Sequence, residues 1–165
     1  MTETHWPRVH TVGVDGFLVS FGNRLSEAAN RAALAFRGAL EEARLSGVEE
    51  TSTSLASAYL RFDALGHDHA EIETALAALI ADRDWFAAEL PQGRRLWRIP
   101  TVYGTELAPQ LEEAAAKAGL TVAEAVKTLS ETRVRVQTIG FAPGQPYLGE
   151  LSPTWDIPRQ TELTP

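Results

Sequence analysis

Arginine side chains form the group whose type and spacing best suit binding chemistry. Arg133 and Arg135 alternate along a short run that ends at Ile139, which would place both on the polar face of one strand. A guanidinium group holds a carboxylate through two parallel hydrogen bonds, so this pair is a candidate for binding an anionic substrate. A second cluster could bind a carboxylate too, although a solvent-exposed strand face explains it more simply; it comprises Arg94, Arg95 and Arg98.

The run from Gly140 to Gly149 follows that strand directly and contains three glycines and two prolines among aromatic and apolar residues. Proline fixes φ and lacks a backbone donor, while glycine permits conformations closed to other residues, so the run cannot be a helix. We expect a stiff, shaped loop carried on a sheet, the kind of position where binding residues often lie. A corner that only turns the chain is the alternative, because glycine and proline clusters mostly mark turns.

Several other chemistries are excluded by composition or by missing motifs. Cysteine is absent, which removes disulfides, thiol nucleophiles and cysteine-bound metals. The chain contains no G-x-x-x-x-G-K-[ST] phosphate loop, no G-x-G-x-x-G and no G-x-S-x-G nucleophile elbow. His67-Asp68-His69 has metal-binding residue types but no third ligand at a clear spacing, so we interpret Asp68 as the cap of a helix and predict no metal site.

The net charge of −7 over 165 residues argues against nucleic acid as a partner, because phosphate binding needs a basic surface. No apolar run approaches the ~20 residues of a membrane-spanning helix. Residues Met1 to Arg8 lack the apolar core of a secretory signal. A cytoplasmic protein with neither a membrane nor a nucleic-acid partner is the simplest prediction.

Residues 1–99 show an order of strands and helices typical of a ferredoxin-like α+β domain. Apolar residues alternate in the predicted strands and recur at helical spacing in the segments between them. The predicted order is Phe17–Phe21, a helix between Asn23 as N-cap and Gly47, Glu49–Ser54, Ser57–Phe62, a helix from Asp68 to near Trp85-Phe86, and a last strand at Arg95–Ile99. This split βαβ order predicts an antiparallel sheet with both helices on one face.

Residues 100–165 form a second predicted domain. Two short helices are expected, at Gln110–Ala118 and from Val122 to about Ser130, with Gly119 in the left-handed conformation that ends the first. Thr121 and Glu124 are spaced as a capping box for the second helix. The alternating strand at Arg133–Thr138 and the Gly140–Gly149 loop follow.

Four segments of the chain match signature motifs of one known family. Gly140–Gly149 resembles G-F-x-P-G-x-x-Y-L-G, and Ile99–Gly104 resembles I-P-V-x-Y-G. Leu111, Ala115 and the Gly119-Leu120-Thr121 step resemble D-L-x-x-V-A…G-L-T, and Pro158-Arg159 resembles a P-R pair. The chain thus resembles the carboxyltransferase C/D-subdomain family, which includes the B-type component of prokaryotic 5-oxoprolinase, the first component of allophanate hydrolase-like proteins and a sporulation histidine-kinase inhibitor.

The resemblance implies that residues 100–165 open a cyclophilin-like β-barrel. Only two or three strands are predicted there, and these cannot close a barrel without leaving a bare edge. We therefore expect an incomplete barrel, either because the natural chain continues past Pro165 or because a partner supplies the missing strands. We prefer the first explanation.

The resemblance also implies a function, that of the B-type subunit in a two-component, ATP-dependent 5-oxoprolinase or allophanate hydrolase-like enzyme. The partner would be a larger C-type subunit, and the substrate a small anionic amide. ATP is implied by the family alone, because the chain shows no ATP-binding motif. Catalytic residues stay unassigned, and the candidate substrate or subunit contacts are Gly140, Phe141, Pro143, Gly144, Tyr147, Arg135 and Arg159.

Three signature positions depart from the family's pattern. Leu129 stands where many members have a histidine before serine, Gln145 replaces an aromatic residue, and Gln110 replaces an aspartate. Leucine cannot donate, accept or shuttle a proton, so any such role of that histidine is lost. The departures fit a retained fold with altered activity. They also fit two alternatives, a non-catalytic protein that inhibits a histidine kinase through the loop and a structural protein without activity.

Overall fold

The computed structural model describes residues 5–161, which divide into two compact units. Residues 137–145 group with residues up to 94, and the second unit holds residues 95–136 together with those from 146 onward. The two-domain division expected from the sequence, at residue 99, stays a prediction.

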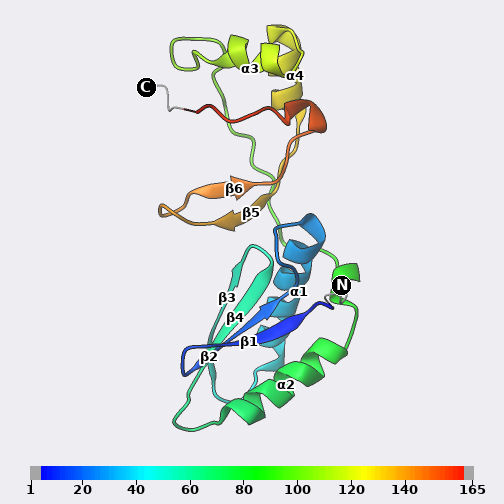
Figure 1. Cartoon of the computed structure of the whole chain (residues 1–165), viewed down its shortest axis with the longest axis vertical. Coiled ribbons are helices and arrows are strands. Elements are labelled where there is room, and N and C mark those ends of the chain that lie inside the picture. The colour runs from blue at the N-terminus through cyan, green and yellow to red at the C-terminus, as the bar shows by residue number, and fades with distance from the viewer. Residues whose placement is uncertain (1–4, 162–165) are drawn as a thin grey trace. The chain divides into compact units, whose positions relative to one another are not determined.

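The first unit is built on a four-stranded antiparallel sheet in the order β1-β2-β4-β3 (Figure 1). Its strands are β1 (Arg8–Val12), β2 (Gly16–Ser20), β3 (Val48–Ser54) and β4 (Ser57–Phe62). In the centre, Phe17 lies opposite Leu60 and Val19 opposite Ala58. Side chains alternate between the faces of a strand, so these four residues lie on one face and form its apolar side.

Helices α1 (Glu27–Ala43) and α2 (His69–Ala81) cover that apolar face. Both contribute to one continuous core with β2 and β4, in which Phe36 of α1 packs against Phe21 and against Trp85 of the short 3-10 helix η1 (Trp85–Ala87). The opposite face of the sheet carries half-buried or exposed side chains such as Tyr59 and Arg61. An antiparallel sheet with both helices on one face is therefore confirmed.

The predicted strand at Arg95–Ile99 is wrong, because this segment has no strand partner and all of its residues are exposed. The edge of the sheet beside β2 is filled instead by β1, which pairs with β2 across a tight turn that includes Gly13 at φ 65°. Pairing two segments a few residues apart costs less loop-closure entropy than bringing residue 95 back to residue 16. The fourth strand of the expected split βαβ order thus comes from the other end of the domain, and the ferredoxin-like description stays a prediction.

The predicted helix boundaries in the first unit also need correction. The N-cap of α1 is Ser26, whose hydroxyl accepts a hydrogen bond from the Ala29 N–H at 3.2 Å, and not Asn23. The helix ends at Arg44, which itself adopts the left-handed conformation at φ 46°, before Gly47 is reached. Helix α2 stops at Ala81, short of the predicted end near Trp85.

The second unit contains α3 (Leu111–Lys117), α4 (Val122–Glu131) and the 3-10 helix η2 (Pro153–Trp155). Leu111, Ala115 and Ala125 form its small core, against which Tyr103 and Trp155 pack. The indole Nε1 of Trp155 donates to the Thr128 hydroxyl at 3.3 Å and so ties η2 to α4. The capping box of Thr121 and Glu124 and the left-handed Gly119, at φ 68°, are confirmed.

Strands β5 (Val136–Ile139) and β6 (Pro146–Leu148) form a separate two-stranded sheet (Figure 1). The strand predicted at Arg133–Thr138 is therefore shorter and shifted toward the loop, and Val136, which alternates with the two arginines, is exposed. No closed barrel occurs in residues 5–161, and the described architecture is a mixed α/β fold with antiparallel sheets. Over the same range no helix is both long and apolar enough to cross a bilayer.

Candidate functional site

The loop between β5 and β6 is held in a tight, solvent-exposed turn. Its ends meet where the Gly140 N–H donates to the Gln145 carbonyl at 3.1 Å, and inside it the Gln145 N–H donates to the Ala142 carbonyl at 3.0 Å. Gly144 lies at φ 77°, a conformation that favours glycine. The predicted stiff corner is confirmed as a shape, while its role in contacting a substrate or subunit stays a prediction.

Phe141 is the unusual residue of this loop. It adopts φ 65°, which is rare for a bulky side chain, and 97% of its surface is exposed. The turn thus holds a large apolar ring in solvent at a cost in backbone strain. Strain of this kind concentrates at recognition sites and switch segments, so Phe141 is the strongest candidate of the loop for a contact with another protein.

The other predicted contact residues lie on different elements. Tyr147 lies on β6 with 43% of its surface exposed. The carbonyl of Arg135 accepts a hydrogen bond from the Gly149 N–H at 2.8 Å, which extends the pairing of the ribbon beyond β5 and β6. Pro143 is exposed at the turn. Of these residues, the structure therefore pairs the main chain of Arg135 with that of Gly149, within the second unit.

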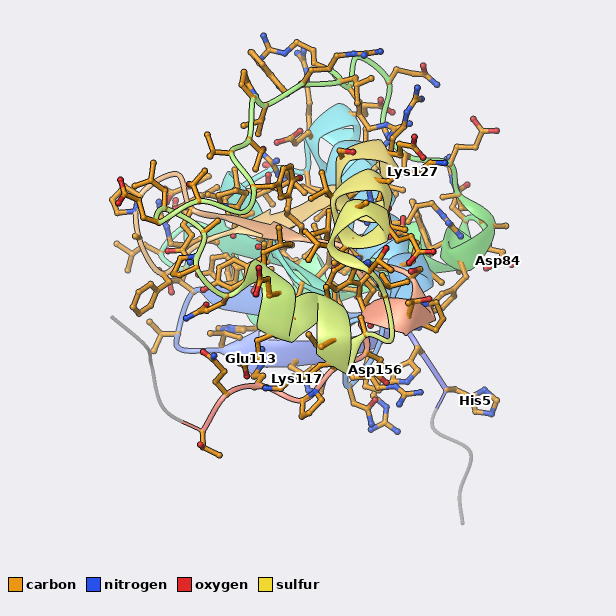
Figure 2. All side chains as sticks on the ribbon, turned by 90° about the horizontal axis from the view of Figure 1, so that it is seen from above. His5, Asp84, Glu113, Lys117, Lys127 and Asp156 are labelled. Carbon is orange, nitrogen blue, oxygen red and sulfur yellow. The ribbon has the colours of Figure 1, made fainter. Side chains whose placement is uncertain are left out.

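Arg159 lies elsewhere in the second unit, beside α3. It lines a hollow of about 260 Å³ together with Gln110, Glu113 and Lys117. Lys117 Nζ donates to the Glu113 carboxylate at 2.5 Å, and this bond lowers the pKa of Glu113 (Figure 2). Because the lysine charge is already paired, Arg159 supplies the positive charge available to an incoming anion there.

A second hollow of this unit, about 630 Å³, lies around Leu129, one of the positions that depart from the pattern of the resembling family. Leu129 and Ser130 line it from α4, and Thr101 and Tyr103 line it from the segment before α3. Two arginines, Arg98 and Arg133, lie on the same lining, and the remaining lining residues are Leu96, Trp97, Ile99, Glu131, Thr132 and Val134. We define these residues as the Leu129 hollow.

The Leu129 hollow combines positive charge with an apolar surface. Within residues 5–161 neither Arg98 nor Arg133 forms an ion pair. The Ser130 hydroxyl donates to the Lys127 carbonyl at 3.1 Å, and the Thr101 hydroxyl donates to the Ile99 carbonyl at 3.1 Å, so both oxygens keep lone pairs for a ligand donor. Such a surface suits a small molecule with one carboxylate and one amide.

Sequence reasoning placed Arg98 on a solvent-exposed strand face and did not connect it with Arg133. The strand is wrong, and the structure places both arginines on one hollow. Two signals pointed to this place, because the Ile99–Gly104 motif and the Leu129-Ser130 step both belong to segments that line it. Their proximity is not visible in either segment alone.

The acidic and histidine side chains of the described residues offer no metal centre. No group of three or more His, Asp or Glu side chains within residues 5–161 is placed to hold a metal ion. Asp68 accepts a hydrogen bond from the Glu71 N–H at 2.8 Å, which confirms its interpretation as the cap of α2. His69 packs edge-on against Phe17 and Phe62, and His67 lies 3.6 Å from the Glu71 carboxylate.

Comparison with known proteins gives this site a family context. The model of the carboxyltransferase domain, subdomain C and D, matches residues 7–165. The B-type subunit of 5-oxoprolinase from Bacillus subtilis (strain 168) is 28% identical over 165 residues, which cover 96% of this chain and 69% of that protein. The B-type subunit of 5-oxoprolinase from Escherichia coli O157:H7 is 38% identical over 81 residues, which cover 48% of this chain and 37% of that protein.

Solved structures of one further protein are also similar to this chain. The crystal structure of TTHA0988 matches with a TM-score of 0.66 and 30% identity, over 89% of this chain and 28% of that one. A second crystal form of TTHA0988 matches with a TM-score of 0.64. The chain therefore spans about two thirds of the Bacillus subtilis relative and less than a third of TTHA0988.

Proposed function

The chain belongs to the carboxyltransferase domain, subdomain C and D, family, and on that premise we propose that it is a B-type subunit of an ATP-dependent 5-oxoprolinase-like amide hydrolase. The observation that carries the proposal is the match to the B-type subunit of the Bacillus subtilis 5-oxoprolinase over 96% of the chain. The Leu129 hollow supports it, because its residue types suit the substrate that this relative's name gives. A cytoplasmic location is part of the proposal.

In the proposed reaction water opens the cyclic amide of 5-oxoproline, the C–N bond breaks, and the product is glutamate. The substrate carries one free carboxylate, which Arg98 and Arg133 would hold through charge-assisted hydrogen bonds. The ring would pack on Leu129 and Trp97, and the amide N–H would donate to the Ser130 or Thr101 hydroxyl oxygen. Such contacts orient the substrate and exclude water from one of its faces.

The proton transfers of this reaction need acid–base groups, and the hollow offers few. Its lining contains one carboxylate, Glu131, one phenol, Tyr103, and no histidine. We therefore propose that the acid–base residues come from a C-type subunit, which would dock on the exposed loop through Gly140, Phe141, Pro143, Gly144 and Tyr147. Arg135 and Arg159 are secondary candidates for subunit or anion contacts.

The resemblance to the family implies ATP, but no described residue of this chain is a candidate for binding it. Residues 5–161 contain no glycine-rich loop that leads into a helix N-terminus and could cradle a triphosphate. The described residues therefore do not fit ATP by a known pattern. We propose that ATP binds to the partner protein.

Co-expression of this chain with its cognate C-type subunit tests the proposal. We expect a complex that co-purifies and releases glutamate from 5-oxoproline only when ATP is present. The matched control replaces 5-oxoproline by 2-pyrrolidinone, which keeps the cyclic amide but lacks the carboxylate, and we expect turnover to be lost. A stable complex without turnover of 5-oxoproline, of another cyclic amide or of allophanate would contradict the enzymatic function.

A regulatory function is the second candidate, and two observations favour it. Leu129, whose side chain cannot transfer a proton, lines the hollow, and Phe141 is almost fully exposed to solvent. In that case the loop would dock on the dimerisation helices of a histidine kinase and inhibit it. Pull-down with a kinase dimerisation domain distinguishes the candidates, because Phe141→Ala should abolish capture if the loop is the inhibitory surface.

A further inference from the structure

A polar hollow of about 560 Å³ lies in the first unit and shares no lining residue with the Leu129 hollow. It is lined by Arg31 of α1 and by the segment from Ala87 to Arg94 that follows η1. All of these residues belong to one compact unit. The hollow therefore does not depend on how the second unit is completed.

Arg31 is held in an unusual state at this hollow. One terminal nitrogen, Nη2, donates to the Phe86 carbonyl at 3.1 Å, which fixes the side chain between α1 and η1. Its Nε is shielded from solvent and has no hydrogen-bond partner within residues 5–161. A buried donor left without an acceptor costs free energy, and such groups in folded proteins usually mark a missing partner.

The charges around the hollow favour an anionic partner. Arg94 adds a second guanidinium group and Gln92 a side-chain amide, while Gly93, at φ 76°, lies in the left-handed conformation. Glu89 is the opposing group, since its carboxylate lies on the same lining. Neither arginine forms an ion pair with Glu89 in the described part of the chain. The local charge is thus net positive in a protein whose total charge is −7.

We propose that this hollow binds a compact oxyanion, a carboxylate or a phosphate, through the guanidinium groups of Arg31 and Arg94. A planar guanidinium offers donors in a fork that matches two oxygens of one carboxylate or phosphate group, and a small shift of the loop from Ala88 to Gly93 would let the anion reach Nε. An apolar ligand would find little surface, because the lining is mostly polar. The site is independent of the function proposed above.

Such an anion would join α1 to the segment that follows η1. Arg31 by itself contacts η1, through the single bond to the Phe86 carbonyl, and forms no bond to the segment after it that is described. A ligand bound by both Arg31 and Arg94 adds a second connection, and any ligand that binds only the folded state raises the unfolding temperature by mass action. The proposed consequence is a first unit whose stability follows the concentration of a small anion.

Titration of the ¹⁵N-labelled chain with inorganic phosphate and with succinate, at constant ionic strength set by sodium chloride, tests the proposal. We expect saturable amide shifts at residues 88–94 and around Arg31 with at least one of the two anions. Arg31→Lys keeps the charge but removes Nε and the fork, and should weaken binding at least about tenfold. Arg37→Lys, on the same helix and paired with Glu41, is the matched control and should leave the affinity unchanged.

Glu89→Gln supplies an independent test that does not weaken the fold. Removal of the opposing carboxylate should strengthen anion binding several-fold, because like charge disfavours the bound anion. The proposal is overturned if the shifts never saturate, if Arg31→Lys and Arg37→Lys bind equally, or if Glu89→Gln leaves the affinity unchanged. An unchanged affinity in Glu89→Gln would mean that the charge around this hollow does not contribute to anion binding.

Discussion

Asn30, on α1, donates through its side-chain Nδ2 to the main-chain carbonyl oxygen of Leu55 at 2.5 Å. The same nitrogen lies 3.1 Å from the Gln137 carbonyl oxygen, and Gln137 groups with the first unit. Asn30 is only 1% exposed, and Leu55 has a φ of 47°, so a buried amide supports the strained turn that joins β3 to β4. The turn also gives β4 its place in the centre of the sheet.

Replacement of Asn30 should therefore destabilise the first unit. Asn30→Ala removes the buried donor that the Leu55 and Gln137 carbonyls share, which should lower the free energy of unfolding by about 1–3 kcal/mol. Asn30→Asp has the same shape but places a carboxylate against two carbonyl oxygens, and should cost at least as much at neutral pH. Urea unfolding followed by the fluorescence of the buried Trp85 measures both. Wild-type stability in Asn30→Asp would contradict the assigned hydrogen bonds.

The start of α1 gives a prediction with an internal control. Ser26 caps the helix through its hydroxyl, whereas Asn23, the cap expected from the sequence, is exposed and lies outside the helix. Ser26→Ala should cost about 1 kcal/mol, while Asn23→Ala should stay within about 0.5 kcal/mol of the wild type. Thermal unfolding monitored by circular dichroism separates the two. The reverse order would mean that the helix begins one turn earlier.

The elements of the first unit that depend on local sequence patterns were predicted correctly, whereas the edge strand of its sheet was not. The strand Ser57–Phe62 has the predicted bounds, because its alternation of buried and half-buried side chains is complete in six residues. The Asp68 cap and the Thr121–Glu124 capping box also depend on residues only three positions apart. The strand predicted at Arg95–Ile99 failed because a strand needs a partner, and the local hairpin of β1 and β2 had already filled that edge.

The candidate site was predictable in part for the same reason. The turn over residues 140–145 follows from glycine and proline chemistry, which acts locally, whereas Pro146–Leu148, predicted as part of the loop, forms strand β6. The proximity of Arg98 and Arg133 depends on how α3 and α4 pack, and no spacing in the sequence encodes it. Arg31 was missed entirely, since in a helical pattern it reads as an ordinary polar residue.

The capping box of α4 predicts a pH effect on the second unit. The Thr121 hydroxyl and N–H both donate to the Glu124 carboxylate, at 2.7 and 2.8 Å, and these bonds lower the pKa of Glu124. A carboxyl group whose pKa is lower in the folded state contributes stability above its unfolded pKa of about 4.3, and this contribution is lost as the pH falls through the folded pKa. The loss should therefore occur in the acidic range below about pH 4.3.

Glu124→Gln should remove that part of the pH dependence. The variant should be less stable than the wild type at pH 7, and the difference should shrink as the pH falls below about 4. Thermal unfolding of both proteins between pH 3 and 7 gives the comparison. Glu112→Gln removes an exposed carboxylate from α3 without touching the capping box, and serves as the control. A stability difference between Glu124→Gln and wild type that grows toward low pH would contradict the assigned cause.

Activity of the proposed complex should depend on the Leu129 hollow through substrate affinity. Arg133→Ala removes one of two guanidinium groups and should raise the KM for 5-oxoproline about tenfold or more, with a smaller effect on kcat, because the carboxylate is bound in both the ground and transition states. Arg37→Ala is the control, since that arginine pairs with Glu41 on α1 and does not line the hollow. An equal effect of the two substitutions would place the substrate elsewhere.

Gly119 gives the last prediction, which concerns the link between α3 and α4. Its φ is 68°, and no atom lies within 4 Å of the position that a Cβ would occupy, so a substitution there meets conformational strain but no clash. Gly119→Ala should lower the stability of the second unit by about 1 kcal/mol, whereas Gly119→Asn should cost less, because asparagine tolerates the left-handed conformation.

Gly38 is the opposite case, because it lies inside α1 with no atom within 4 Å of its Cβ position and with no positive φ. Gly38→Ala should stabilise the first unit by about 0.5–1 kcal/mol through helix propensity. Urea unfolding of the three variants measures these differences, and equal costs for Gly119→Ala and Gly119→Asn would show that packing, not φ, selects glycine at this position.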